Sequence, residues 1–368
     1  MQIFILTFVF SWFSTLMVLR YQHLHERFTA DHDFGGVQKF HTTAVPRVGG
    51  VSVMAAMLVC LLWLAYKAPN EFKAFGLLLV AASPAFIGGL VEDCTKRVGV
   101  LARLVLTMLA AALGFWLLKA GINRLDIPLL DSAMSFWVVA LIFTMVAVGG
   151  VVNAVNIIDG YNGLASMVSI MMLAALGYVG FQLGDPLIWK AALAMMGGIL
   201  GFFVWNYPRG LIFLGDGGAY LIGFMIAELS VLLVARHPQV SPWFPLLVVM
   251  YPVFETLFSI YRKKFLRGMS PGMPDGVHLH MLIYKRLVRW AVGSKHAGEK
   301  TTRNAMTSPY LWLLCSFAVL PAVLFWDNRL MLQIFVVVFA VLYIVLYRRL
   351  VKFNAPRWLL VRKISDKK

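Results

Sequence analysis

The feature that most constrains this fold is a succession of apolar stretches along the whole chain. About eleven of them approach the roughly 20 residues that a helix needs to cross the hydrocarbon core of a bilayer. They cover residues 3–19, 51–66, 75–91, 100–118, 136–152, 164–180, 187–205, 220–234, 243–260, 311–326 and 331–347. Because backbone hydrogen bonds in lipid must be satisfied internally, this pattern predicts an all-α, polytopic membrane protein.

Composition supports a single bundle of membrane helices over residues 1–368, with a long loop at 261–309. The chain is 60% hydrophobic and 14% charged, with a mean hydropathy of +0.79, which is outside the range of soluble proteins. The first apolar stretch lacks a basic segment before it and a small-residue cleavage pattern after it, so we expect a retained helix. The three cysteines show neither pairing nor metal-ligand spacing.

The distribution of positive charge predicts the orientation in the membrane. A net charge of +16 could indicate nucleic acid binding in a soluble protein, but in a membrane protein it indicates basic cytoplasmic loops beside anionic lipid. If Arg103, just inside the fourth stretch, is counted with the loop before it, only seven of the 33 Lys and Arg residues fall outside the loops after the odd-numbered stretches and the C-terminal tail: Lys67, Lys73, Lys119, Arg124, Lys190, Arg236 and Arg329. We therefore expect an external N-terminus, a cytoplasmic C-terminus and no nucleic acid partner.

The segment 153–165, NAVNIIDGYNGLA, is the most unusual polar segment between apolar stretches. Asn153, Asn156 and Asp159 recur at every third position and would occupy one narrow face of a helix. Gly160 and Gly163 would then end the helix and let the backbone approach a ligand. Polar groups are costly at this depth, so we favour a functional site over a helix end in which Asn and Gly serve only the turn.

Other polar motifs fall on the same predicted face of the membrane. Adjacent Glu92 and Asp93 follow the third apolar stretch and could bind Mg²⁺ or accept a proton. Asp216 lies in GDGG before a helix, where it could hold Mg²⁺ beside phosphate, or merely cap the helix. We expect chemistry at this cytoplasmic face.

Three further motifs contribute candidate binding groups. The first loop, KFHTTAVPRVGG, offers Lys39, His41 and Arg47 for phosphate, unless it is only a basic loop with a Pro-Gly turn. Pro252 is expected to kink the ninth stretch, which carries Glu255. Within 261–309, His278 and His280 could contact a pyrophosphate or donate protons, and residues 279–290 suggest a short amphipathic helix on the membrane surface.

Taken together, these motifs resemble the polyprenyl-phosphate N-acetylhexosamine-1-phosphate transferases of glycosyl transferase family 4. The resemblance extends from the His41–Gly50 loop to NAMTSPYLW at 304–312. Glu92-Asp93 stands where the family usually has Asp-Asp, and Asn162 stands where a second Asp is common after N-x-x-D. His278 and His280 match the His-rich loop, in which Met281 replaces a frequent third His. The PRVGG loop is more similar to the N-acetylglucosamine branch than to the muramoyl-pentapeptide branch.

The resemblance implies transfer of sugar-1-phosphate from a UDP-N-acetylhexosamine to undecaprenyl phosphate in the bacterial inner membrane, with release of UMP. It implies Mg²⁺ as cofactor, with Mn²⁺ as a substitute, and a lipid product that starts a surface polysaccharide such as O-antigen. The metal residue would be Asp216; the catalytic residues would be Glu92, Asp93, Asn156, Asp159, His278 and His280; the substrate-binding residues would be Lys39, His41, Arg47, Asn153, Asn162, Asn206 and Glu255.

Two mechanistic routes and one rival function stay open at this point. Asp93 could accept a proton from the acceptor or orient its phosphate for direct attack, or a carboxyl-phosphate intermediate could form. The rival is a transporter or flippase for an anionic lipid or solute, although transporters often carry internal repeats and midplane sites, and this sequence shows neither. A homodimer fits the sequence as well as a monomer does.

Overall fold

The computed structural model describes residues 1–31, 45–270, 276–288 and 297–353. Nearly all of this is helical, as the sequence predicts. The bounds from the N-terminus to the centre are α1 Gln2–Arg20, α2 Gln22–Thr29, β1 Ala30–Asp31, β2 Val45–Pro46, α3 Gly49–Lys67, α4 Pro69–Thr95, α5 Val100–Leu118, α6 Pro128–Met134 and α7 Trp137–Ile158. Those that follow are α8 Leu164–Gln182, α9 Pro186–Asn206, α10 Gly215–Arg236, α11 Trp243–Val248, α12 Met250–Tyr261, η1 Arg262–Leu266, α13 Leu279–Ile283, η2 Tyr284–Val288, α15 Ala297–Leu324 and α16 Arg329–Val351.

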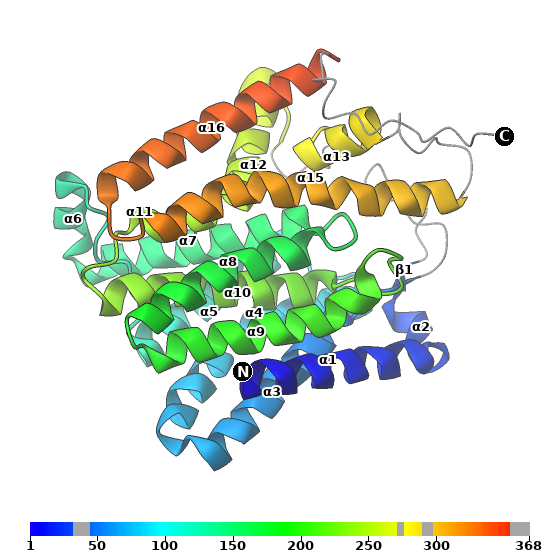
Figure 1. Ribbon diagram of the computed structural model, residues 1–368, viewed down its shortest axis with the longest axis horizontal. Helices are drawn as coiled ribbons and strands as arrows, with labels where there is room; N and C mark the ends of the chain where they lie inside the picture. Colours follow the sequence, from blue (N-terminus) through cyan, green and yellow to red (C-terminus); the bar gives the residue numbers. More distant parts are fainter. Residues whose placement is uncertain (32–44, 271–275, 289–296, 354–368) are drawn as a thin grey trace.

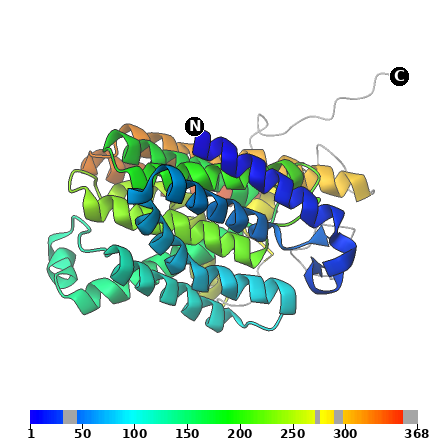
Figure 2. The same cartoon turned by 90° about the horizontal axis from the view of Figure 1, so that it is seen from below.

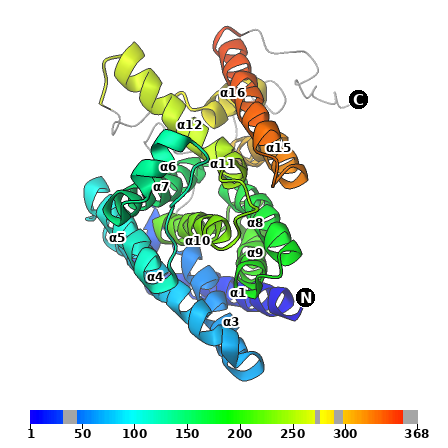
Figure 3. The ribbon, with the colours of Figure 1, turned by 90° about the vertical axis from the view of Figure 1, so that its left-hand side faces the viewer.

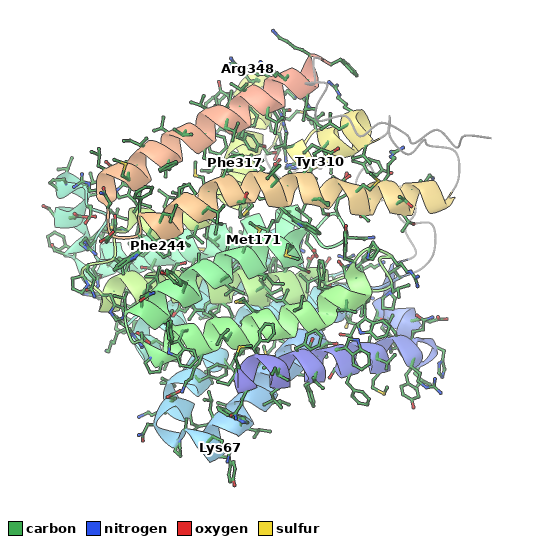
Figure 4. All side chains as sticks on the ribbon, viewed as in Figure 1. Lys67, Met171, Phe244, Tyr310, Phe317 and Arg348 are labelled. Carbon is green, nitrogen blue, oxygen red and sulfur yellow. The ribbon has the colours of Figure 1, made fainter. Side chains whose placement is uncertain are left out.

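Ten of the described helices are long and apolar enough to cross a membrane, namely α1, α3, α4, α5, α7, α8, α9, α10, α15 and α16. The long helices run in roughly one direction across the molecule, with α6 at one end and α2 at the other (Figure 1, Figure 2). Their outer faces are apolar and open: Phe317 on α15, labelled in Figure 4, is 55% exposed. Such a surface suits lipid, and the protein is a multi-pass membrane protein.

The predicted ninth span is a broken helix. Its residues form the short α11 and the twelve-residue α12, which meet at Val249. Pro252 lies three residues beyond the break and has no N–H to donate to the carbonyl of Val248, so the helix cannot run through. Figure 3 shows α12 slanting away from the ring of helices.

Helix α10 lies at the centre of the bundle. Figure 3 places it inside a ring that includes α4, α5, α7, α8 and α9, and 89% of the residues in its most apolar 18-residue stretch are buried. Because α10 is enclosed on every side, its first residues lie where several other helices end. This position brings the predicted motifs together.

The predicted loop 261–309 is mostly helical in its described parts. It contains η1, α13, η2 and the first half of α15, which begins at Ala297. A helix does form after His278, but its apolar side chains, such as Leu282 and Leu287, are buried in the protein core. The prediction that this helix lies on the membrane surface is therefore wrong, because the apolar face packs against protein.

Candidate active site

Asp216 lies in the first turn of α10 and receives contacts from three other segments. Its Oδ1 accepts a hydrogen bond of 3.0 Å from Asn156 Nδ2 on α7. Arg47 Nη2 lies 3.7 Å from the same oxygen, and Arg103 on α5 donates to Oδ2. Two guanidinium groups and an amide therefore surround a carboxylate whose side chain is 12% exposed.

Asp93, at the end of α4, caps α10. Its Oδ1 accepts from the Asp216 N–H and its Oδ2 from the Gly217 N–H, each at 2.9 Å. Arg47 Nη2 lies 3.8 Å from Oδ1, and the residue is 2% exposed. The capping role that the sequence offered as the alternative for Asp216 is thus filled by another acid, from a distant helix, and the Asp216 carboxylate is left to face the basic groups.

Glycines allow the ends of three helices to meet at this point. A Cβ on Gly50 of α3 would lie 2.3 Å from the Cα of Gly218. A Cβ on Gly89 of α4 would lie 2.5 Å from the carbonyl carbon of Asp216. In both cases the obstacle is backbone, which cannot rotate away, so glycine is required for this approach.

The first loop is fixed to the segment that leads into α10. The Phe213 N–H donates to the Pro46 carbonyl at 2.8 Å, and the Gly49 N–H donates back to the Phe213 carbonyl at 3.0 Å. β1 and β2 pair through Ala30 with Pro46. These backbone bonds hold Arg47 beside Asp93 and Asp216. Lys39 and His41, predicted from the same loop, lie outside the described residues.

The three residues of the central motif have different environments. Asn153 Nδ2 donates to the Gly149 carbonyl of its own helix at 2.8 Å, whereas Asn156 reaches Asp216. Asp159 follows the last residue of α7. Although this residue as a whole is only partly buried, enclosure of its carboxyl raises its pKa well above the ordinary value; Arg47 opposes this shift and Asp93 adds to it.

Asn162 and Asn206 hold the loop after α7 in place. The Asn162 N–H donates to Asn304 Oδ1 at 2.7 Å, and Asn162 Nδ2 donates to the Pro208 carbonyl at 3.0 Å. Asn206 Oδ1 accepts from the Gly163 N–H at 2.6 Å. Both side chains are buried, so the structure shows them joining protein segments; substrate contact by either one stays a prediction.

One of the two histidines, His280, lies against the same loop, and His278 stacks on it. Their rings stack with centroids 5.1 Å apart, and His280 meets the Tyr161 ring edge-on at 5.4 Å. His278 Nδ1 lies 2.9 Å from Glu255 Oε1. Burial lowers the pKa of His280 to about 3, with Glu255 opposing the shift, so His280 is neutral at pH 7.

Two further residues refine the sequence prediction. Glu92 accepts a bond of 2.7 Å from the Val98 N–H, which places its carboxylate in the turn between α4 and α5. Arg103 was not predicted as a site residue, although it contacts Asp216 directly. The signal for it was present, since a guanidinium one turn inside an apolar helix needs an acidic partner.

Comparisons with known proteins agree with the motifs. The glycosyl transferase family 4 profile matches residues 75–234. The chain is 26% identical over 247 residues to a probable undecaprenyl-phosphate N-acetylglucosaminyl 1-phosphate transferase of Bacillus subtilis, covering 66% of each protein. It is 29% identical over 259 residues to the undecaprenyl-phosphate alpha-N-acetylglucosaminyl 1-phosphate transferase of Escherichia coli, covering 67% of each. It is also 30% identical over 229 residues to the phospho-N-acetylmuramoyl-pentapeptide-transferase of Lactobacillus gasseri, covering 59% of this chain and 69% of the relative. The match thus spans about two thirds of these relatives.

Proposed function

The chain belongs to glycosyl transferase family 4 and is a sugar-phosphate transferase, and we propose that it transfers an N-acetylhexosamine-1-phosphate, of the N-acetylglucosamine type, from a UDP-sugar to undecaprenyl phosphate. UMP is the second product. The observation that carries this proposal is the Asp216 carboxylate at the start of α10, with Arg47, Arg103 and Asn156 gathered around it. The similarity to enzymes that act on undecaprenyl phosphate supports the same acceptor here.

The charges at this site suit a reaction between two phosphate groups. Both substrates are anions, so their approach requires cations between them. Arg47 and Arg103 supply two, and the guanidinium fork matches phosphate oxygens. In this proposal Arg47 contacts donor diphosphate while the backbone bonds of the first loop keep it in position.

The residues present fit Mg²⁺ in its usual mode of binding in phosphoryl transfer. Among the described residues, no three His, Cys, Asp or Glu side chains form a metal site by themselves. Mg²⁺ commonly uses one or two protein carboxylates and completes its coordination with substrate phosphates and water. Asp216 would hold the ion, which would neutralise phosphate charge, and Mn²⁺ is the expected substitute.

The proposed chemistry is a displacement at the phosphorus that carries the sugar. An oxygen of the lipid phosphate bonds to that phosphorus, and the bond to the UMP oxygen breaks with its electron pair leaving on UMP. Any proton on the attacking phosphate must pass to a nearby base, for which Asp159 and His278 are our candidates. Asp93 has both oxygens on backbone amides, so we now assign it a positioning role. The covalent route would instead need a carboxylate to attack first.

The isoprenoid chain of the acceptor needs an apolar surface in the bilayer. A cavity of about 380 Å³ lies between residues 121–130, α7, the second half of α10 and α11, with Ile122, Val151, Ala227 and Val249 among its walls. Val151 lies on the same helix as Asn156, about 7 Å along the axis. We propose that part of the chain lies in this cavity while its phosphate reaches Asp216.

We also propose an inner-membrane location with the Asp216 end facing the cytoplasm. UDP-sugars are water-soluble, and the basic residues concentrate in the loops at this end. The N-terminus would then lie outside and the C-terminus inside. The sugar product would start a cell-surface polysaccharide, of which O-antigen is one candidate.

The test is UMP release by the purified protein in detergent with Mg²⁺, undecaprenyl phosphate and a panel of UDP-N-acetyl sugars. We expect release that needs both lipid and metal and falls ~10²-fold or more in Asp216→Asn. Asp327→Asn is the matched control, because Asp327 is an exposed acid in the turn between α15 and α16. No release with any sugar, from protein shown to be folded, would contradict the proposal and favour the transporter.

A further inference from the structure

Three hydrogen-bond donors converge on the Glu255 carboxylate of α12. Its Oε1 lies 2.9 Å from His278 Nδ1 and accepts the Leu279 N–H at 3.0 Å. Its Oε2 accepts the Tyr343 hydroxyl of α16 at 2.8 Å. Glu255 is 1% exposed and Tyr343 is fully buried, so water does not compete for these bonds.

This arrangement fixes the proton of the His278 ring. An ionised carboxylate only accepts hydrogen bonds, so Nδ1 must be the donor towards Oε1. The neutral ring then has its proton on Nδ1, and Nε2 is the nitrogen that can take up another proton. His280 stacks on this ring but makes no hydrogen bond to Glu255 among the described contacts, so only His278 is oriented directly by the acid.

Helix α16 supports the same segment at a second point. The Tyr347 hydroxyl accepts from Arg262 Nη1 at 2.5 Å and donates to the Val277 carbonyl at 3.2 Å. Arg262 also donates to that carbonyl at 2.8 Å. The residue before His278 is therefore bonded both to Tyr347 of α16 and to Arg262.

We propose that Tyr343 is a positioning residue for the transfer, acting through Glu255 to hold His278 in the Nδ1-protonated tautomer with its ring in a single orientation. This inference rests on the proposed function, because it assigns His278 a proton-handling role in that reaction. Tyr343 lies far beyond the matched residues 75–234, so the family comparison does not reach it. The inference comes from the three-bond geometry alone.

The test removes only the phenol oxygen, with Tyr343→Phe. We expect kcat to fall about tenfold with KM for the UDP-sugar changed less than ~twofold, because positioning acts on the chemical step. In the His278→Asn background the same change should cost less than ~twofold, since its effect passes through His278. Tyr251→Phe is the matched control: Tyr251 is fully buried and its hydroxyl makes no hydrogen bond within the described part of the chain.

A second readout does not depend on activity. In protein labelled with ¹⁵N-histidine, the signals lost in His278→Asn identify this ring, and we expect its Nδ1 to be protonated in the wild type and a tautomer mixture in Tyr343→Phe. Glu255→Gln should give the same mixture if Tyr343→Phe fails to fold. An unchanged tautomer, or an equal loss of kcat with and without His278, would overturn the inference. If the wild type releases no UMP while the tautomer still depends on Tyr343, the proposed function fails, whereas the positioning geometry stands.

Discussion

Two regions of the molecule hold their polar groups in different ways. One is the crossing of α3, α4 and α10 around Asp216, and the other is the Glu255 cluster of α12, α13 and α16. At the crossing, backbone touches backbone through Gly50 and Gly89, and the capping bonds of Asp93 end on main-chain amides. In the Glu255 cluster, the side chains of Glu255 on α12, Tyr343 on α16 and His278, which precedes α13, bond to one another. Backbone contact leaves no room for a side chain, whereas a side-chain network can lose one bond and keep its packing. Substitutions of the crossing glycines should therefore be all-or-none, and substitutions within the Glu255 cluster should be graded.

The largest expected effect is at Gly89. In Gly89→Ala the new methyl would meet the backbone of Asp216 and Gly217 at 2.5 Å, so α4 and α10 must separate. We expect a loss of stability at the upper end of the ~1–3 kcal/mol usual for overpacking, or more, and no detectable transfer. Thermal unfolding in detergent and UMP release would measure both effects.

Gly150→Ala is the control for this substitution. Gly150 lies within α7, and a Cβ there meets nothing within 4 Å. Alanine favours helix by up to about 1 kcal/mol over glycine, so this variant should be as stable as the wild type or more so. Equal stability of Gly89→Ala and Gly150→Ala would break the comparison, because it would mean that the crossing can yield.

Asp93 and Asp216 should respond in opposite ways to the same chemical change. Asp93→Asn keeps one acceptor but opposes an NH₂ group to one of the two capped amides, which should cost about 1–3 kcal/mol. Asp216→Asn should lose activity at a smaller cost in stability, because its carboxylate caps no helix and the amide oxygen of asparagine can still accept a hydrogen bond from Arg103 or Asn156. Unfolding temperatures of the two variants, measured side by side, would sharpen the distinction between holding the site and acting in it. The reverse order of stabilities would contradict it.

The sequence predicts the membrane spans and the gathering of the motifs better than it predicts which residues contact one another. Apolar length and polar interruptions are local features, so ten spans and the GDGG helix start could be foreseen from them. The capping of α10 by Asp93 joins residues 123 positions apart, and no local pattern encodes it. Tyr343 is similar, since a tyrosine in an apolar helix gives no sign of its partner. The break at Val249 was only half foreseen, because Pro252 indicates a kink and not two separate helices.

The smallest expected effect concerns pH and Asp159. The enclosed carboxyl has a raised pKa in the folded protein, whereas in the unfolded chain it should titrate near ~3.9. Between these two values the folded state binds more protons, so the contribution of Asp159 to stability falls as pH rises through that window.

The variant Asp159→Asn removes this dependence of stability on pH. It should therefore raise the free energy of unfolding at pH 7 to 8, by no more than about 1 kcal/mol because the residue keeps some exposure to solvent, and have no effect below about pH 4. Asp327→Asn, at an exposed acid, should change stability at neither pH. If Asp159 also accepts the proton of the acceptor phosphate, Asp159→Asn should gain stability and lose activity together. This is the expected behaviour of a catalytic group that lowers the stability of the fold. If the free energy of unfolding of the wild type and of Asp159→Asn changed in parallel from pH 4 to 8, the carboxyl of Asp159 would be solvated. Asp159 would then be part of neither the crossing around Asp216 nor the Glu255 cluster.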